Sequence, residues 1–491
     1  MKTRKWIPNT LFFAGILLLR ASRIAAPDVQ IEDPNYIYGA FLIMKGMLPF
    51  AEFAQVNPPL LEFILAVLYR IFGVSHRIPE GMSALAFILS AVLIRRLGDR
   101  LADSRSAGMI AAYLYSIHYL LFRYHVFERE TYATLGVLVA IELLTRTGQT
   151  RWTPVVAGLV TGFAFACKQT AVVPCAGIVS FLVIFQQDFR SAIRFAAGFT
   201  FFVILITAGY SAAFGSLYIE QTFWFHWIKG YVAPWYIKAA WTTSGLGYLV
   251  PLTIGSAWFF RKSKTNWHWL CVILILLDLA FFWFVSGAFW PHYLLSTLPF
   301  CALLSGRTLA EVIGAHSAVS RATACASLVS IAVLIGLMQI IQPGAVWGTG
   351  VADRYGFAGT PRQAVREAAT AIQLHTQETD LIISDPFIAL ESQRIKVVRF
   401  KDNWGLILWM KRMMDAGEYR VAVKKLSGQR FGDVRKRSQM YWMPLIETAF
   451  SEGSVGAVQP NYELPLDASH LSSHGMKIVL QNEFYTIWVR K

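Results

Sequence analysis

Apolar runs alternate with short polar links over the first two thirds of the chain. Eleven such runs are centred near Leu17, Phe87, Tyr115, Val137, Ala164, Ile178, Val203, Val250, Ile275, Leu298 and Val333. Because about 20 consecutive apolar residues cross a bilayer as a helix, the runs predict membrane spans. The pattern therefore predicts a polytopic α-helical membrane protein with about 11 transmembrane helices.

Basic residues gather in every second link between these runs. The basic links are residues 2–5, 95–105, 146–151, 190–194, 261–264 and 307–321. Short cytoplasmic links carry an excess of lysine and arginine, so the alternation places the N-terminus and the basic links in the cytoplasm. Arg20 and Arg23 fall on the outer side and fit this topology less well.

One further apolar segment, Pro58 to Gly73, affects the whole topology. If it were a span, every later link would lie on the opposite side of the membrane. The segment is short for a span of about 20 residues, and it contains Glu62 and Arg70. We predict an amphipathic helix that lies on the outer membrane surface.

The first apolar run, Leu11 to Leu19, leaves two alternatives. A nine-residue run behind a basic start fits a cleaved signal peptide. Arg20 and Arg23 occupy the place of a cleavage region, and they favour an uncleaved helix. Cleavage would leave the orientation of the later helices unchanged.

The pattern changes after Pro343-Gly344 to that of a small α/β domain. A Thr-Pro start followed by helical spacing predicts a helix from Thr360 to Thr376. Strands are predicted at residues 381–384, 396–400, 419–423 and 484–490. We divide the chain into a transmembrane domain, residues 1–341, and a soluble domain, residues 342–491. The odd number of spans puts the soluble domain in the periplasm or lumen.

Composition supports the membrane assignment and removes other classes. Apolar residues make up 55% of the 491 residues and charged residues only 15%, whereas soluble domains carry about 25% charged residues. The formal net charge is +15, but the basic residues sit in links, which indicates anionic lipid rather than nucleic acid as the partner. The five cysteines lie in apolar runs and offer no disulfide framework.

Ionisable residues gather at the predicted outer ends of several helices. They are Asp33 in the first outer loop, Arg123, His125, Glu128, Arg129 and Glu130 between the third and fourth spans, Lys168 between the fifth and sixth, and His292 at the start of the tenth. Singly, each has an ordinary explanation: carboxylates suit helix N-termini, and lysines extend toward headgroups. Their shared side of the membrane makes the set a candidate site, because unpartnered ionisable groups are costly there.

The motifs of this outer side resemble those of membrane glycosyltransferases of the GT-C superfamily. The pattern comprises Asp33, a Tyr-x-x-Gly stretch from Tyr36, Gly46-x-x-Pro-Phe-x-Glu-Phe53, Pro58-Pro-Leu60, Phe72-Gly73, Arg129-Glu130, Lys168, and His292-Tyr-Leu-Leu-Ser-Thr-Leu-Pro299. The branch it resembles contains the dolichyl-phosphate-mannose protein mannosyltransferases and the lipid A aminoarabinose transferase. The resemblance covers residues 1–340 and implies a GT-C-like fold with juxtamembrane helices in the first outer loop.

The resemblance implies an enzyme that moves a sugar from a polyprenyl-phosphate-linked donor to a lipid, glycan or protein acceptor at the outer face. The location it implies is the bacterial inner membrane. In this reading Asp33 is the catalytic carboxylate. Cations for the donor phosphate are Lys168, His292, Arg123 and Arg129. Substrate-binding roles fall to Glu130, Glu128, Asn57, Tyr36 and Tyr293.

Two positions depart from the family pattern. Pro34 follows Asp33 where a second acidic residue is common, and Asn57 replaces the lysine that the aminoarabinose transferase has before Pro-Pro. No cofactor is expected, although His125, Glu128 and Asp33 could together hold a divalent cation.

Two other function classes remain as alternatives. A flippase for polyprenyl-linked glycans or lipids would place charged residues near the middle of the membrane and show repeat symmetry. An O-antigen ligase or polymerase would place a large outer loop in the middle of the chain. The outer clustering of ionisable residues and the C-terminal soluble domain favour the glycosyltransferase.

Overall fold

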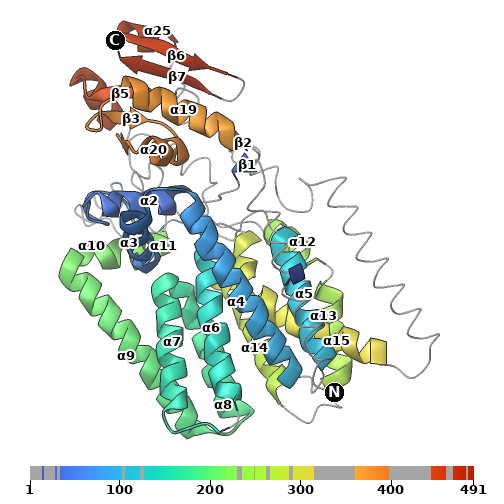
Figure 1. Ribbon diagram of the computed structural model, residues 1–491. Helices are drawn as coiled ribbons and strands as arrows, with labels where there is room; N and C mark the ends of the chain where they lie inside the picture. Colours follow the sequence, from blue (N-terminus) through green and yellow to red (C-terminus); the bar gives the residue numbers. More distant parts are fainter. Residues whose placement is uncertain are drawn as a thin grey trace. The chain divides into compact units, whose positions relative to one another are not determined.

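The computed structural model describes two compact parts of the chain (Figure 1). Described are residues 14–15, 28–29, 34–101, 105–121, 127–146, 148–228, 235–247, 249–260, 266–286, 291–314, 360–397, 444–459, 468–482 and 485–490. Unit 1 contains residues 1–25, 82–208 and 233–355, and unit 2 contains residues 26–81, 209–232 and 356–491. The predicted boundary between residues 341 and 342 lies outside the described residues.

Unit 1 is a bundle of helices that follows the predicted apolar runs. Its main helices are α4 (Arg77–Leu101), α5 (Arg105–Leu121), α6 (Arg129–Thr145), α7 (Thr153–Cys167), α8 (Val172–Ile184), α9 (Phe189–Phe214), α12 (Trp235–Leu246), α13 (Leu249–Phe260), α14 (Trp267–Ala280) and α15 (Leu298–Gly314). Helices α4 and α9 extend at one end into unit 2. Within the bundle α6 packs on α7, α8 on α14, and α15 on both α5 and α13.

Glycines allow α7 and α9 to approach closely. A Cβ atom added to Gly158 would lie 2.1 Å from the carbonyl oxygen of Phe195, and one added to Gly198 would lie 2.2 Å from that of Val155. Such contacts are only possible without a side chain, and small residues at the interface are typical of helices packed in a membrane.

Three of the described helical segments are long and apolar enough to cross a membrane. They are α4, α9 and the continuous segment Trp267–Val285, in which α14 runs on into the π-helix η4 (Phe281–Val285). Shorter apolar helices cover Thr153–Cys167 and Gln169–Ile184. The runs near Leu17 and Val333 fall on residues that are almost entirely outside the described ones, so the number of eleven spans stays a prediction.

The tenth predicted span begins later in the structure than its apolar run suggests. Residues Pro291–Leu295 form a short 3₁₀ helix, η5, and α15 starts only at Leu298. Pro299 explains the shift, because proline lacks the N–H that a helix interior needs and is tolerated in the first turn. His292 and Tyr293 therefore precede the helix.

The segment Pro58–Gly73 forms a single helix, α3 (Leu60–Phe72), which Pro59 and Gly73 flank. Thirteen residues rise about 20 Å, which is less than the roughly 30 Å of a hydrocarbon core. Its exposed positions include Val67, Ile71 and Phe72, while the carboxylate of Glu62 is fully buried. The segment is thus too short to span, as the sequence predicts, and apolar residues lie on both its exposed and its buried side.

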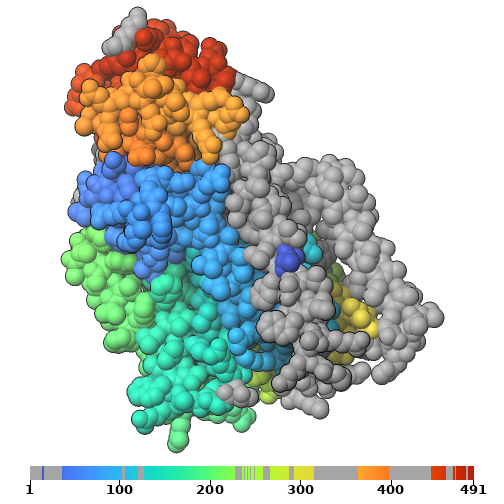
Figure 2. Space-filling model, in the orientation of Figure 1, coloured from blue at the N-terminus to red at the C-terminus, as the bar shows by residue number. Residues whose placement is uncertain are grey.

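Unit 2 is built on a five-stranded mixed sheet of order β4-β3-β5-β7-β6. The strands are β3 (Leu381–Ile383), β4 (Ile395–Lys396), β5 (Val455–Val458), β6 (Met476–Gln481) and β7 (Thr486–Arg490). β3 pairs in parallel with β4 and β5, whereas β7 runs antiparallel to β5 and β6. Helices α19 (Arg362–His375) and α20 (Pro386–Ser392) belong to the same part. In Figure 2 the residues of this helical region are orange and lie next to the red C-terminal residues.

The predicted strands at residues 381–384 and 484–490 overlap β3 and β7. The predicted strand at residues 396–400 shares only Lys396 with β4, and residues 398–400 lie outside the described residues. The predicted strand at residues 419–423 lies outside the described residues. The sequence did not predict β5 and β6. The core of the sheet depends on β5, because its Val455 and Val458 are fully buried and belong to one apolar cluster with Ile383, Phe450 and Trp488.

Helix α2 (Pro34–Met44), from the first predicted outer loop, packs on α20 in unit 2. The hydroxyl of Tyr38 accepts the backbone N–H of Lys396 at 2.7 Å and donates to the carbonyl of Arg394 at 3.2 Å. His76 Nδ1 lies 2.6 Å from Glu391 Oε1. The first loop and the C-terminal part are therefore joined by specific polar contacts.

Candidate active site

The candidate site begins where α6 begins. Phe127 has φ 62°, an uncommon conformation for a bulky residue, and its N–H donates to the hydroxyl of Ser83 at 2.7 Å. This turn starts the helix with Glu128 as the N-cap and Arg129 and Glu130 in the first turn. The N-terminal end of a helix dipole stabilises both carboxylates.

Lys168 approaches Glu130 from the end of α7. The residue ends that helix in an extended conformation, and the short 3₁₀ helix η2 (Gln169–Ala171) follows it directly. Its ammonium group donates to Glu130 Oε1. Both side chains are buried, with 11% of the Lys168 side chain and 2% of the Glu130 side chain exposed.

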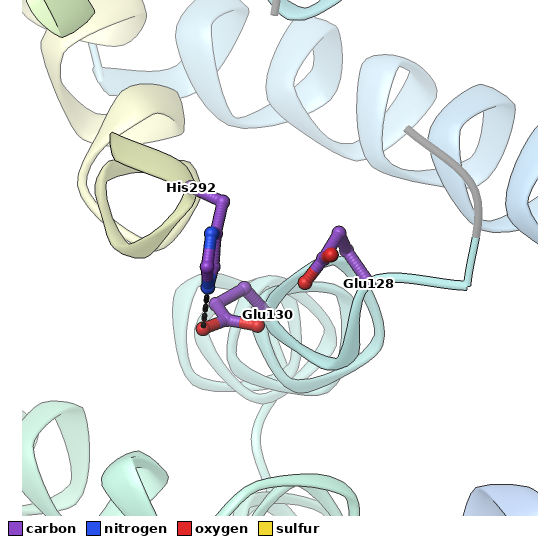
Figure 3. A group of neighbouring side chains, drawn as sticks. All are labelled: Glu128, Glu130 and His292. Carbon is purple, nitrogen blue, oxygen red and sulfur yellow. Dashed lines mark ion pairs between the residues drawn. The ribbon is translucent and has the colours of Figure 1, made fainter. Parts of the chain in front are cut away.

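Two aromatic residues of η5 complete the cluster. His292 Nε2 lies 3.8 Å from the same Glu130 oxygen (Figure 3), and η5 packs on α6. The Lys168 ammonium lies 4.4 Å from the centre of the Tyr293 ring, a cation–π geometry. Three segments far apart in the sequence thus bring Glu130, Lys168, His292 and Tyr293 together, and all four were singled out from the sequence.

Asp278 on α14 is a member of this region that the sequence reading missed. Its carboxylate is buried and accepts hydrogen bonds from the hydroxyls of Ser296 and, at 2.6 Å, Thr297. These residues follow η5 directly, so Asp278 holds the segment that carries His292. A signal was present in the sequence, because Asp278 is a lone carboxylate inside an apolar run.

The buried ion pair between Lys168 and Glu130 fixes the positions of both charged groups. A buried ion pair is costly to form and very costly to break, because the remaining partner is left charged without compensation. Lys168 contacts Glu130 and the Tyr293 ring, and Glu130 Oε2 has no hydrogen-bond partner among the described residues. The pair is a preorganised cation beside a carboxylate that can accept a further donor.

The same carboxylate belongs to a group that could hold a divalent metal ion. One ligand atom each of Glu128, Glu130 and His292 lies within 4.8 Å of the others (Figure 3). Two carboxylates and an imidazole suit several divalent ions. This set differs from the one considered from sequence, since His125 and Asp33 lie outside the described residues. Lys168 already occupies Glu130 Oε1, so a metal ion would compete with an ammonium group there.

The other predicted phosphate ligands lie in different surroundings. Arg129 is 1% exposed and donates from Nη1 to the carbonyl of Cys167 at 3.3 Å, so it contacts the end of α7 next to Lys168. Arg123, like the proposed catalytic residue Asp33, lies outside the described residues. Their roles stay predictions.

Asn57 and Tyr36 belong to unit 2, where they form a separate polar group. Asn57 Nδ2 donates to the Tyr36 hydroxyl at 2.7 Å. The neighbouring Gln55 donates to Glu62 Oε1 at 3.1 Å, and its N–H donates to Gln221 Oε1 at 3.1 Å. This buried network ties the first outer loop to the π-helix η3 (Glu220–Trp224).

Comparison with known proteins gives the class of the fold. Residues 56–210, which include Asn57, Glu130 and Lys168, match a family model described as dolichyl-phosphate-mannose-protein mannosyltransferase. No curated protein sequence matches the chain. The match extends over about a third of the chain, and over that part the chain is similar to this family.

A solved structure covers the whole chain. ArnT from Cupriavidus metallidurans in the apo state matches with a TM-score of 0.62 at 14% sequence identity, over 99% of this chain and 98% of that one. ArnT is the GT-C lipid A aminoarabinose transferase. The two matches confirm the resemblance that the sequence motifs predict, to the branch that contains both relatives.

Proposed function

We propose that the protein transfers a sugar from a polyprenyl-phosphate-linked donor to an acceptor at the outer face of the membrane. The observation that carries the proposal is the convergence of Lys168, Glu130 and His292 from three segments, two of them inside the family match. The acceptor classes are a lipid, a glycan or a protein. The membrane proposed is the bacterial inner membrane, with the N-terminus in the cytoplasm and residues 342–491 in the periplasm.

Lys168 and His292 are suited to the phosphate of the donor. Transfer breaks the bond between the anomeric carbon and the phosphate oxygen, so negative charge grows on the departing polyprenyl phosphate. Cations fixed in a water-poor site stabilise such a charge more than they would in water. The Lys168 ammonium, held over Tyr293 and beside Glu130, provides a cation whose position is set before the donor arrives.

Glu130 has the role of a holder for these cations. Its Oε1 contacts both Lys168 and His292, and its Oε2 remains available to an acceptor hydroxyl. Asp33 is the proposed general base. It takes the acceptor proton while the acceptor oxygen bonds to the anomeric carbon, and the electron pair of the broken bond leaves with the phosphate. Arg123 and Arg129 remain candidate phosphate ligands, and no cofactor is part of the proposal.

The experiment uses the full chain in nanodiscs with a polyprenyl-phosphate-linked hexose or pentose whose sugar is labelled. Lipid extract, envelope glycan and membrane protein are offered separately as acceptors. We expect label to pass to one of them, and Lys168→Met to lower the rate on the order of 10²-fold, as for loss of one charge-stabilising donor. Lys477→Met, the same change at an exposed position on β6, serves as the control.

Near-normal transfer by Lys168→Met would show that the Lys168 ammonium has no role in the reaction. Absence of transfer with every donor and acceptor would refute the proposed activity. The proposed topology is tested separately with a reporter fused to the C-terminus. It should be active only outside the cytoplasm, and cytoplasmic activity would overturn the shared outer face.

A further inference from the structure

A second ionic cluster lies at the other end of α6. Glu142 is buried, with 2% of its side chain exposed, and three arginines surround its carboxylate. Arg100 binds it with two hydrogen bonds of 2.9 and 3.1 Å, Arg96 Nη2 lies 2.8 Å from Oε1, and Arg146 Nε lies 3.5 Å from the same oxygen. The cluster joins the last turns of α4 and α6.

The charges of this cluster do not balance. Among the described residues, one carboxylate faces three guanidinium groups, which leaves an excess of two positive charges. Asp99, the other acidic residue on this end of α4, faces away toward α5, since a Cβ on Gly108 would lie 2.2 Å from its Oδ1. The arginine side chains remain open, with 49% of Arg96, 35% of Arg100 and 50% of Arg146 exposed.

The buried carboxylate fixes the arginines while leaving them accessible. A guanidinium group has five N–H donors, so one that binds Glu142 still has donors for a second acceptor. Fixing long side chains in advance lowers the entropy cost of binding. Guanidinium groups bind phosphate through paired hydrogen bonds, so an anionic phosphate is the ligand that this arrangement suits.

The surroundings indicate a lipid as the source of that phosphate. Leu85, Leu89 and Arg96 share one face of α4 at helical spacing, and both leucines are exposed, at 59% and 43%. An acyl chain could therefore lie along α4 below a headgroup held at Arg96. At the start of α7, Trp152 is 60% exposed and Arg151 lies 5.5 Å over its ring, as expected at a membrane interface.

We propose that Arg96, Arg100 and Arg146, held by Glu142, bind the headgroup phosphate of an anionic phospholipid in the cytoplasmic leaflet. The basic links predict the cytoplasmic side for this end of the bundle. The site is independent of the proposed sugar transfer, because Glu130 lies twelve positions away on α6, about 18 Å at the rise of an α-helix.

The experiment titrates the purified full chain in a neutral detergent with short-chain phosphatidylglycerol and reads binding by thermophoresis. Phosphatidylcholine with the same chains is the neutral probe. The variant Arg96→Gln/Arg146→Gln removes the two most open arginines and keeps the Arg100–Glu142 pair. The control Arg190→Gln/Arg194→Gln makes the same charge change at two exposed arginines at the start of α9, also predicted cytoplasmic.

We expect phosphatidylglycerol to bind more tightly than phosphatidylcholine. The Arg96/Arg146 variant should weaken phosphatidylglycerol binding about thirtyfold, which is the usual effect of two basic residues at anionic lipid. The Arg190/Arg194 control should change it less than twofold. Equal weakening in both variants would reduce the effect to net charge and overturn the site. Displacement by inorganic phosphate at similar concentration would overturn the lipid assignment.

A variant that conserves charge keeps the test valid if the glutamine variant fails to fold. Arg96→Lys/Arg146→Lys retains both positive charges but loses the paired donors. We expect an intermediate loss of phosphatidylglycerol binding, with a melting temperature close to that of the unmodified chain. Undiminished binding would show that the fork geometry of the arginines is not used, and the proposed site would fall.

Discussion

Helix α6 carries a buried glutamate at each end, and the two glutamates differ in what surrounds them. Glu130 and Glu142 have the same side-chain exposure, 2%. Glu130 shares its carboxylate with Lys168 and His292, of whose side chains only 11% and 16% are exposed. Glu142 is held by three arginines that are a third to a half exposed.

The difference separates two environments of one residue type on one helix. Around Glu130 both partners are withdrawn from water, so their interactions are strong and can be passed to a charged substrate. Around Glu142 the cations are open, and solvent or headgroups compete with the carboxylate. Burial of the glutamate alone therefore does not distinguish the two ends of α6, whereas burial of its partners does.

The sharpest test of this comparison removes the charge at each end in turn. Glu130→Gln leaves Lys168 and His292 without their shared carboxylate, and we expect sugar transfer per folded molecule to fall on the order of 10²-fold. Glu142→Gln leaves arginines that water can solvate, so transfer should change less than threefold, with a stability loss of about 1–2 kcal/mol.

Transfer assays and thermal unfolding of both variants in the same nanodiscs separate the two effects. Expression and membrane insertion serve as the control for folding. Equal losses of activity at the two ends would mean that α6 acts as a single structural element, and the distinction between its ends would be wrong.

A second test concerns the support of His292. Asp278→Asn weakens the hydrogen bonds to Ser296 and Thr297 that hold the segment after η5. We expect transfer to fall about tenfold, because positioning errors near a reacting group are costly. In a His292→Gln background the same change should add little, since its effect passes through that histidine. Full additivity of the two losses would contradict a positioning role.

These residues also show which parts of the candidate site could be predicted from the sequence. Glu130, Lys168 and His292 could be found because motifs and sidedness place them at one face. Their shared carboxylate oxygen could not, because it depends on how three helices pack. Asp278 was missed although a lone carboxylate in an apolar run is a recognisable signal.

Some parts of the fold could likewise be predicted from the sequence, and others could not. The apolar runs and Pro58–Gly73 are read from pattern and length, and helices lie there in the described residues. Strand β5 was missed because it contains Gly456 and Ala457, which are poor strand formers, and only its central place in the sheet buries it. The late start of α15 follows from Pro299, and a hydropathy average over many residues does not register the effect of a single proline.

A smaller effect is expected at the ring below Lys168. Tyr293→Phe keeps the aromatic face that lies 4.4 Å from the ammonium group, and transfer should stay within twofold. Tyr293→Leu removes it, and we expect a loss of about threefold to fivefold, since a cation–π contact is worth about 1 kcal/mol. Transfer rates at saturating donor measure both. An equal loss for Tyr293→Phe and Tyr293→Leu would assign the role to the hydroxyl, which both changes remove.

The smallest effect is expected at Glu391, a third carboxylate, whose partner is also a histidine but whose side chain is 20% exposed. Burial raises the pKa of Glu391, but the hydrogen bond and charge of His76 outweigh it and hold the pKa below its ordinary value of 4.5. A lowered carboxyl pKa contributes stability that is present above the ordinary value and is lost as the pH falls through the lowered one. Glu391→Gln should therefore cost about 1 kcal/mol near neutral pH and nothing in strong acid. Unfolding of the full chain, followed by fluorescence over that pH range, measures the difference. If the stability cost of Glu391→Gln did not change with pH, the contact would act by packing, and the charge of Glu391 would contribute nothing to stability.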